Sequence, residues 1–154
     1  MGILNVTPDS FSDGGKWIDA ETAIAHAHRM VAEGADVIDV GGESTRPKAE
    51  AVSDDEQIAR VEPVIRGLRE AGVETPISID TMSPTVAEVA IVAGASIIND
   101  VAGGRFGTID IAARTGAPII LMHMQGDPRT MQDAPQYGDV VRDILDYLIE
   151  RTDA

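Results

Sequence analysis

Residues 34–39 read Gly-Ala-Asp-Val-Ile-Asp, residues 94–99 read Gly-Ala-Ser-Ile-Ile-Asn, and residues 116–123 read Gly-Ala-Pro-Ile-Ile-Leu-Met-His. In each stretch a Gly-Ala pair precedes a short apolar run, and a polar residue closes the stretch. Glycine commonly ends helices, and short apolar runs are typical of buried strands. Each stretch therefore predicts a helix that turns back into a strand.

Apolar periodicity extends this pattern over the whole chain. We expect strands at residues 2–4, 37–40, 77–79, 96–98 and 118–122. Most of these runs are nearly continuous apolar stretches, which favours parallel strands covered on both faces. Helical spacing or capping residues mark helices near 23–31, 53–68, 83–90, 109–114 and 141–148. The alternation predicts one α/β domain without a linker.

Five polar residues stand at or near the ends of the expected strands: Asn5, Asp39, Asp80, Asn99 and His123. Ligands of α/β folds bind beyond the carboxyl ends of parallel strands, so these residues are expected around one rim. For any single strand, a polar residue that starts a loop or caps a helix is the better interpretation. Their recurrence on every expected strand favours a ligand site.

Composition excludes several classes of function. The chain has 154 residues and a formal net charge of −14, with 12 basic against 26 acidic residues, which argues against non-specific nucleic-acid binding. No apolar run is long enough to span a membrane, and no charged-then-apolar segment at the start predicts secretion. Cysteine is absent, which is compatible with a cytoplasmic protein. An anionic substrate would need local basic groups or a divalent cation.

Two segments after expected strands carry groups suited to ligands. Residues 5–15 contain the oxygen donors Asn5, Asp9 and Asp13, which suit Mg²⁺, although their spacing alone favours a surface turn with Asx caps. Residues 41–48 begin with two glycines and continue with hydroxyl and guanidinium donors that suit an anion. A solvated turn is the alternative for the second segment.

Asp80 and Asn99 follow consecutive strands in the chain, so both are expected over the same mouth. A carboxylate beside a carboxamide suits a heterocycle with paired N–H donors, such as the amidine-like edge of a pterin or purine. For His123, a rim ligand, a proton carrier and a packed side chain all remain open.

These segments resemble the signatures of the dihydropteroate synthase family, in the family's order. The resemblance is carried by residues 1–15, residues 37–47, Ser78-Ile-Asp-Thr81, Ile98-Asn-Asp-Val101 with the glycines at 103 and 104, and Leu121-Met-His-Met-Gln-Gly126. It implies a (β/α)₈ TIM barrel, here an incomplete barrel with strands 1–5 and helices 1–5. We expect residues 1–154 to form a single partial pterin-binding domain, truncated at both ends.

The resemblance also implies an activity. The family's transferases condense p-aminobenzoate with 6-hydroxymethyl-7,8-dihydropterin diphosphate, giving 7,8-dihydropteroate and pyrophosphate in folate biosynthesis. By resemblance, Asp80 and Asn99 bind the pterin, Asn5 and Asp13 hold Mg²⁺, and no residue acts as a covalent nucleophile. The substrate-binding loops would contribute Phe11, Ser44, Thr45, Arg46 and Pro47. The family is commonly homodimeric.

Two departures qualify the expected activity. Lys48 stands where the family usually has glycine, and the family's Asp-Pro-Gly, Ser-Arg-Lys and Arg-x-His motifs are absent. We therefore expect the chain to be inactive alone and to expose two strand edges and an inner apolar face. The alternatives are a non-catalytic pterin-binding protein and a pterin-dependent methyltransferase barrel, although residues 5–15 favour the synthase.

Overall fold

The computed structural model describes residues 1–7, 20–44 and 51–153. Within them, five strands alternate with five helices, as the sequence predicts. The strands are β1 (Gly2–Asn5), β2 (Ile38–Gly41), β3 (Ile77–Asp80), β4 (Ile97–Asp100) and β5 (Ile119–Leu121). The helices are α1 (Ala20–Ala32), α2 (Asp54–Glu70), α3 (Pro84–Ala93), α4 (Thr108–Thr115) and α5 (Val140–Thr152).

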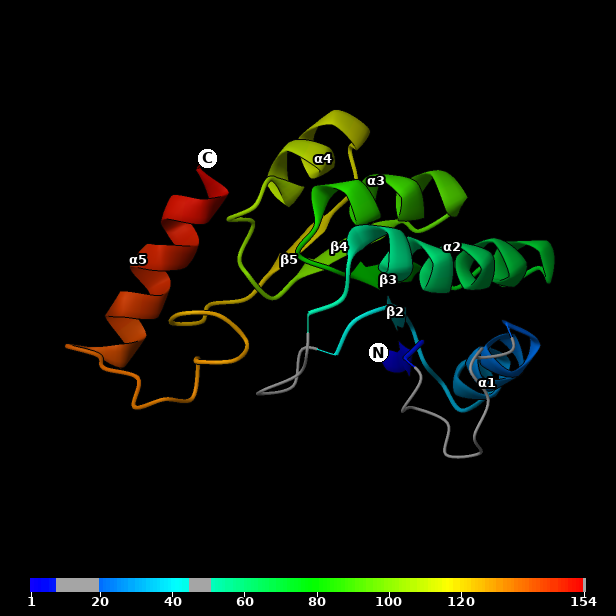
Figure 1. Cartoon of the computed structure of the whole chain (residues 1–154), viewed down its shortest axis with the longest axis horizontal. Helices are drawn as coiled ribbons and strands as arrows, with labels where there is room; N and C mark the ends of the chain where they lie inside the picture. Colours follow the sequence, from blue (N-terminus) through cyan, green and yellow to red (C-terminus); the bar gives the residue numbers. More distant parts are fainter. Residues whose placement is uncertain (8–19, 45–50, 154) are drawn as a thin grey trace.

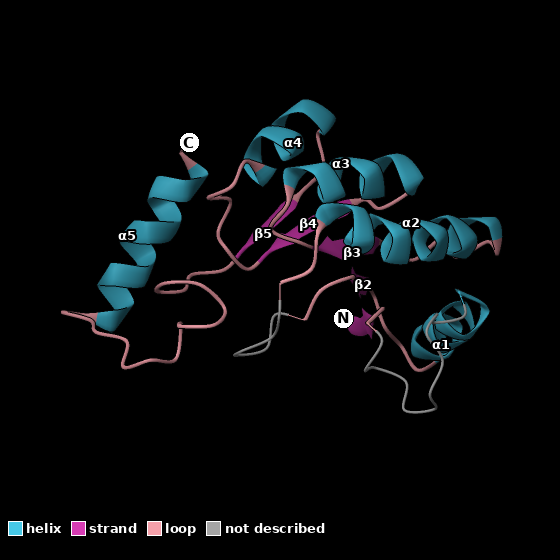
Figure 2. Cartoon of the chain, in the orientation of Figure 1, coloured by secondary structure: helices cyan, strands magenta, loops and turns pink. Residues whose placement is uncertain are grey.

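The strands form one parallel sheet in the order β1-β2-β3-β4-β5, so every strand pairs with its neighbours in sequence. Helices α2, α3 and α4 lie side by side along the sheet, and α1 continues the layer beside β1 and β2 (Figures 1 and 2). This is the β/α alternation of a barrel that has not closed, with β1 and β5 as its two edges. The predicted incomplete barrel is confirmed.

Local signals in the sequence begin and end these helices. The Ser53 hydroxyl accepts a hydrogen bond from the backbone N–H of Glu56 at the start of α2, and Ser83 caps α3 in the same way. Gly34, Gly94 and Gly116, the glycines of the Gly-Ala pairs, have φ angles of 100°, 121° and 73°. Residues other than glycine rarely adopt such backbone angles, which explains why a Gly-Ala pair recurs before these strands.

The core lies between the helices and one face of the sheet. Leu4, Ile38, Val40, Ile77, Ile79 and Ile98 are fully buried on this face. Intervening residues point to the opposite, inner face, where the side chain of Ile3 is 61% exposed and that of Ile120 is 40% exposed. β2 is buried along its whole length and β3 as far as Ile79, so the expectation of strands covered on both faces holds for these central strands. It is wrong for the edge strands β1 and β5, where the expected exposed inner face is confirmed.

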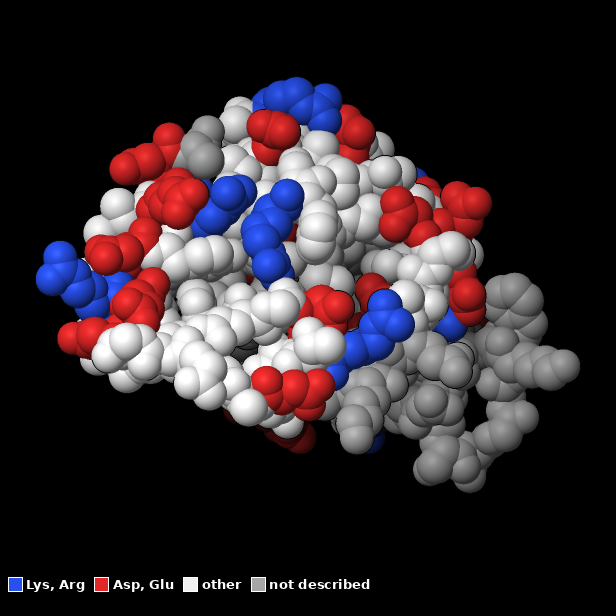
Figure 3. Space-filling model, turned by 60° about the vertical axis from the view of Figure 1, so that its left-hand side comes forward, with Lys and Arg blue, Asp and Glu red and all other residues white. Residues whose placement is uncertain are grey.

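Helix α5 stands apart from the sheet, at the left of Figure 1. It has no buried residue, and the side chain of Val141 is 73% exposed. Polar contacts hold it to the segment between β4 and α4: the Tyr147 hydroxyl donates to the Ala102 carbonyl (3.1 Å), and Arg151 donates to the carbonyls of Gly103 (2.9 Å) and Gly104 (3.1 Å). Figure 3 turns this side forward and shows uncharged surface interrupted by charged groups.

Among the helices of the described residues, none combines the length and the apolar character that crossing a membrane requires.

Candidate functional site

The carboxyl ends of four neighbouring strands bring Asn5, Gly41, Asp80 and Asn99 into one row. The strand register pairs Asn5 with Gly41, Gly41 with Asp80, and Asp80 with Asn99. All four residues therefore lie on the inner face at the same height of the sheet. The structure brings together three of the five polar residues that the sequence predicts for the rim, namely Asn5, Asp80 and Asn99.

Gly41 leaves a gap in this row. A Cβ atom built on Gly41 would lie 3.5 Å from Asn5 Oδ1 and 3.5 Å from Asp80 Oδ2, which are ordinary contact distances. Any side chain at this position would occupy the space between the two oxygens. The glycine therefore keeps open a space flanked by oxygen atoms.

Asp80 carries the most perturbed carboxyl group of the row. Its Oδ1 atom is buried, and no described residue donates a hydrogen bond to it. Burial, and to a lesser extent the negative charges of Asp39, Asp100 and Glu43, together raise the pKa of Asp80 to about 7. A ligand that offers N–H donors or positive charge would satisfy this oxygen and favour the ionised form.

Asp39 does not lie at the rim, contrary to the sequence-based expectation. It sits inside β2, two residues before Gly41, which pairs with Asp80, and its side chain is only 4% exposed. The Ser78 hydroxyl donates to Asp39 Oδ1 (2.5 Å), and Asn99 Nδ2 donates to Asp39 Oδ2 (3.1 Å). Burial raises the pKa of Asp39, and these two hydrogen bonds oppose that rise.

Sequence reasoning did not single out Ser78, and it placed Asp39 at the wrong height. A signal for both was present, because each is a single polar residue between two branched apolar residues of a strand. Such alternation indicates that one strand face meets helices and the other carries polar groups.

The second glycine after β2 has a packing role. A Cβ atom on Gly42 would lie 2.9 Å from Val61 Cγ1 and 3.1 Å from the Gln57 carbonyl oxygen, so α2 leaves no room for a side chain. Arg60 also donates to the Gly42 carbonyl (2.7 Å). Of the two glycines expected to admit a ligand, Gly41 faces the row, whereas Gly42 allows α2 to pack against the strand end.

Glu43 fixes the segment that follows. Its Oε1 accepts from the Val52 backbone N–H (3.0 Å), and its Oε2 accepts from Gln57 Nε2 (3.2 Å). The Gln57 amide also donates to the Val52 carbonyl (3.1 Å). These bonds join the two ends of the segment between β2 and α2 at the base of α2.

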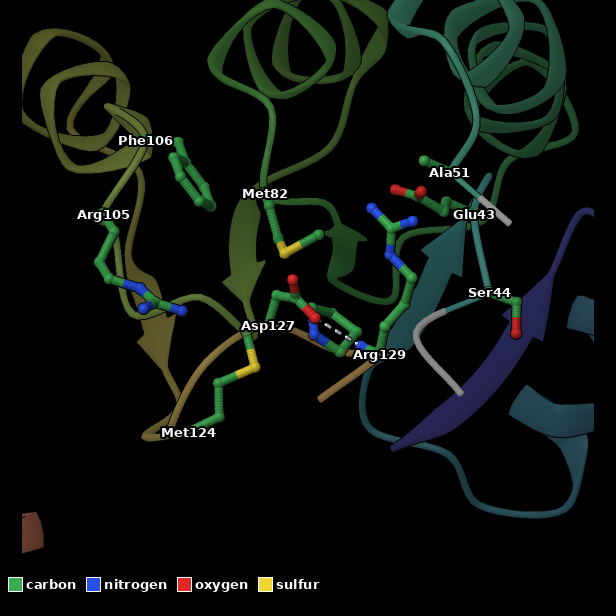
Figure 4. Close-up of a pocket in the computed structure, with 10 residues that line it drawn as sticks. Glu43, Ser44, Ala51, Met82, Arg105, Phe106, Met124, Asp127 and Arg129 are labelled. Atoms are coloured by element: carbon green, nitrogen blue, oxygen red, sulfur yellow. Dashed lines mark hydrogen bonds between the residues drawn. The ribbon is translucent and has the colours of Figure 1, made fainter. Parts of the chain in front are cut away.

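A hollow of about 560 Å³, open solvent included, lies among the loops at the same end of the sheet. Figure 4 shows its lining: Glu43 and Ser44 follow β2, Met82 follows β3, Phe106 follows β4, and Arg129 comes from the segment after β5. Neither Asp80 nor Asn99 lines it. The hollow and the row are therefore separate features of the described chain, with Ser44 in the hollow.

His123 lies two residues beyond the end of β5. Its ring meets that of Tyr147 edge-on with centroids 4.9 Å apart, and it lies 5.8 Å from the ring of Tyr137. Of the three readings left open for this residue, the structure supports the packed side chain.

Five predicted site residues, Phe11, Asp13, Thr45, Arg46 and Pro47, lie outside the described residues. Across residues 1–7, 20–44 and 51–153, no three His, Cys, Asp or Glu side chains lie close enough together to share a metal ion. The oxygen donors beside Gly41 nevertheless fit Mg²⁺ chemically, because hard cations prefer carboxylate and amide oxygens.

Comparison with known proteins places this geometry among pterin enzymes. The family model described as "Pterin binding enzyme" matches residues 1–154. The dihydropteroate synthase of Escherichia coli (strain K12) is 50% identical over 152 residues, which are 98% of this chain and 54% of the relative.

Solved structures agree. A Xanthomonas albilineans dihydropteroate synthase with 4-aminobenzoic acid superposes with a TM-score of 0.85 and 48% identity, covering 97% of this chain and 52% of that one. A Burkholderia cenocepacia dihydropteroate synthase complexed with 7,8-dihydropteroate superposes with a TM-score of 0.81 and 45% identity, covering 99% of this chain and 51% of that one. The chain spans about half the length of the relatives that it matches.

Proposed function

The chain belongs to the family of pterin-binding enzymes, and we propose that it provides the pterin-binding part of a dihydropteroate synthase. The reaction joins p-aminobenzoate to 6-hydroxymethyl-7,8-dihydropterin diphosphate and releases pyrophosphate and 7,8-dihydropteroate. The observation that carries this proposal is the row of Asn5, Asp80 and Asn99 at the carboxyl ends of adjacent strands. Relatives about half identical to the chain support it.

Asp80 and Asn99 are the pterin ligands in this proposal. Asp80 Oδ1 is buried without a donor among the described residues, so it is matched to an N–H group of the heterocycle. Asn99 lies next to it in the strand register. Two neighbouring acceptors hold the ring in one orientation, which fixes where its hydroxymethyl substituent points.

The chemistry needs no nucleophile from the protein. As the diphosphate leaves, the pterin ring stabilises positive charge at the methylene carbon, and the amine of p-aminobenzoate forms the new C–N bond. The arylamine then loses its extra proton. The protein contributes by orienting both substrates and excluding water from the carbon under attack.

The remaining substrate contacts are proposed from the family resemblance. Phe11 and Pro47 would border the p-aminobenzoate site, and Ser44, Thr45 and Arg46 would belong to the same loop contacts. Asn5 and Asp13 would hold Mg²⁺, and the position of Asn5 Oδ1 at the gap beside Gly41 supports this role for Asn5. When bound, the ion would neutralise charge on the diphosphate.

We also propose a cytoplasmic location and a homodimer for the complete enzyme. A chain without cysteine is compatible with a reducing compartment, and the homodimer follows from the family resemblance. Light scattering of the purified complete enzyme tests the homodimer, because a mass of one chain would contradict it.

The test joins residues 1–154 to the remaining part of the Escherichia coli relative and measures pyrophosphate release with both substrates. We expect the chimera to be active, and Asp80→Asn and Asn99→Ala to abolish its activity. The control Asp36→Asn makes the same chemical change at an exposed position and should keep it. A folded chimera without activity would contradict the proposal, and saturable pterin binding without pyrophosphate release would favour the non-catalytic alternative.

A further inference from the structure

Asp39 is too deeply buried to contact a ligand bound at the row of Asn5, Asp80 and Asn99. It nevertheless accepts a hydrogen bond from Asn99, a member of that row. Its side chain is almost fully buried within β2, below the strand ends. One carboxylate oxygen accepts from Ser78, and the other accepts from Asn99 Nδ2 at 3.1 Å. One oxygen is therefore bonded to a side chain of the adjacent strand β3, and the other to a side chain of β4, one strand further along the sheet.

This contact determines which end of the Asn99 carboxamide meets a ligand. A carboxylate can only accept hydrogen bonds, so the NH₂ end of the amide must face Asp39. Turning the amide over would place two acceptor oxygens against each other in a buried position, which is costly. The carbonyl end, Oδ1, is consequently left to face the ligand.

We propose that Asp39 is a positioning residue, which holds the Asn99 carboxamide so that the row presents two adjacent acceptors, Asn99 Oδ1 and the Asp80 carboxyl group. This inference rests on the proposed pterin-binding function. It gives the site a preference for heterocycles with N–H donors along the bound edge, and against those with a carbonyl at the same place. Ser78 holds Asp39 but does not decide the orientation of Asn99.

Two variants separate these roles. In Asp39→Asn, the new amide can donate to Asn99 Oδ1, so the Asn99 carboxamide is free to turn its NH₂ group toward the ligand. In the control Ser78→Ala, Asp39 loses one hydrogen bond but remains an acceptor, so Asn99 keeps its orientation. Asp39→Ser, which is smaller and uncharged, serves as a second test if Asp39→Asn does not fold.

The binding experiment uses the full 154-residue chain and two probes, 6-hydroxymethylpterin and 6-hydroxymethyllumazine, which differ by an amino group and a carbonyl at position 2. We expect the ratio of their dissociation constants to favour the pterin, and to fall by about tenfold in Asp39→Asn, as for the loss of one hydrogen bond between the ligand and Asn99 Oδ1. Ser78→Ala should keep the ratio. An unchanged ratio in folded Asp39→Asn would overturn the proposal.

Nuclear magnetic resonance of the Asn99 side-chain amide gives a readout that does not require binding. In the unaltered chain, one amide proton should be shifted downfield and protected from exchange, and Asp39→Asn should remove that difference. Two equivalent, rapidly exchanging protons in the unaltered chain would overturn the proposal. If the chain binds neither probe but the amide behaves as expected, the pterin-binding function fails and the positioning role stands.

Discussion

The raised pKa of Asp80 makes a quantitative prediction for the variant Asp80→Asn. Burial favours the protonated form of this carboxyl group in the folded chain, whereas in the unfolded chain the group ionises near its ordinary value of 3.8. Between these two pKa values the folded state binds a proton that the unfolded state has released. Stability is therefore fully retained below about pH 4 and falls as the pH rises toward 7.

The size of the effect follows from the shift of about three pH units. Each unit corresponds to about 1.4 kcal/mol, so ionisation of Asp80 lowers the free energy of unfolding by about 4 kcal/mol between pH 4 and pH 8. That is a large share of the roughly 5–15 kcal/mol typical of a domain. Asp80→Asn removes the ionisation and should remove this part of the pH dependence.

Urea denaturation at half-unit steps from pH 4 to pH 8 measures the prediction. The difference in unfolding free energy between Asp80→Asn and the unaltered chain should move in favour of the variant by about 4 kcal/mol over this range. The slope is diagnostic, because a buried asparagine without partners adds a cost that does not depend on pH. Asp36→Asn, at an exposed position, is the matched control.

A difference that stays constant across the range would refute the reasoning. It would mean that Asp80 ionises near its ordinary pKa in the folded chain, and the description of this group as a buried acceptor without a partner would fail. A variant that loses stability relative to the unaltered chain as the pH rises would contradict the sign.

Outcomes are also expected for four further variants. Gly42→Ala should lower the free energy of unfolding in urea by about 1–3 kcal/mol, because the new Cβ lies 2.9 Å from Val61 Cγ1 in α2. Gly41→Ala should change this free energy by less than about 1 kcal/mol, since its Cβ makes only ordinary contacts. The same variant should weaken pterin binding, measured by titration, at least about tenfold. Glu43→Gln should cost about 1–3 kcal/mol, because its new amide opposes a donor, and should speed hydrogen exchange at the Val52 amide. Arg151→Ala removes two hydrogen bonds to the segment before α4 and should accelerate proteolytic cleavage before α5, with Arg142→Ala, on the exposed side of the same helix, as control.

Local patterns were sufficient to predict the elements of the fold. Apolar runs located the strands to within one or two residues, and Ser53 and Ser83 marked the starts of α2 and α3. The Gly-Ala pairs marked the returns to the sheet because positive φ angles require glycine there. These signals act over a few residues, so the sequence contains them directly.

The sequence was sufficient to predict the site residues at the strand ends, but not the buried contacts beneath them. Asn5, Asp80 and Asn99 were predicted together because parallel strands end at one edge. The bond from Asn99 to Asp39 joins residues 60 positions apart and depends on the register of three strands, which no local pattern encodes. The same holds for His123, whose tyrosine partners come from the segment before α5 and from α5 itself.

The hydrogen bonds that Glu43 accepts from Val52 and Gln57 affect how the segment between β2 and α2 tolerates insertions. Because Glu43 binds the Val52 amide, the ends of the intervening segment stay together whatever residues the segment contains. Loop-closure entropy grows only slowly with length, about 0.6 kcal/mol for each doubling. An insertion between positions 44 and 51 would therefore add little loop-closure cost, because Glu43 and Val52 hold the described ends of the segment together.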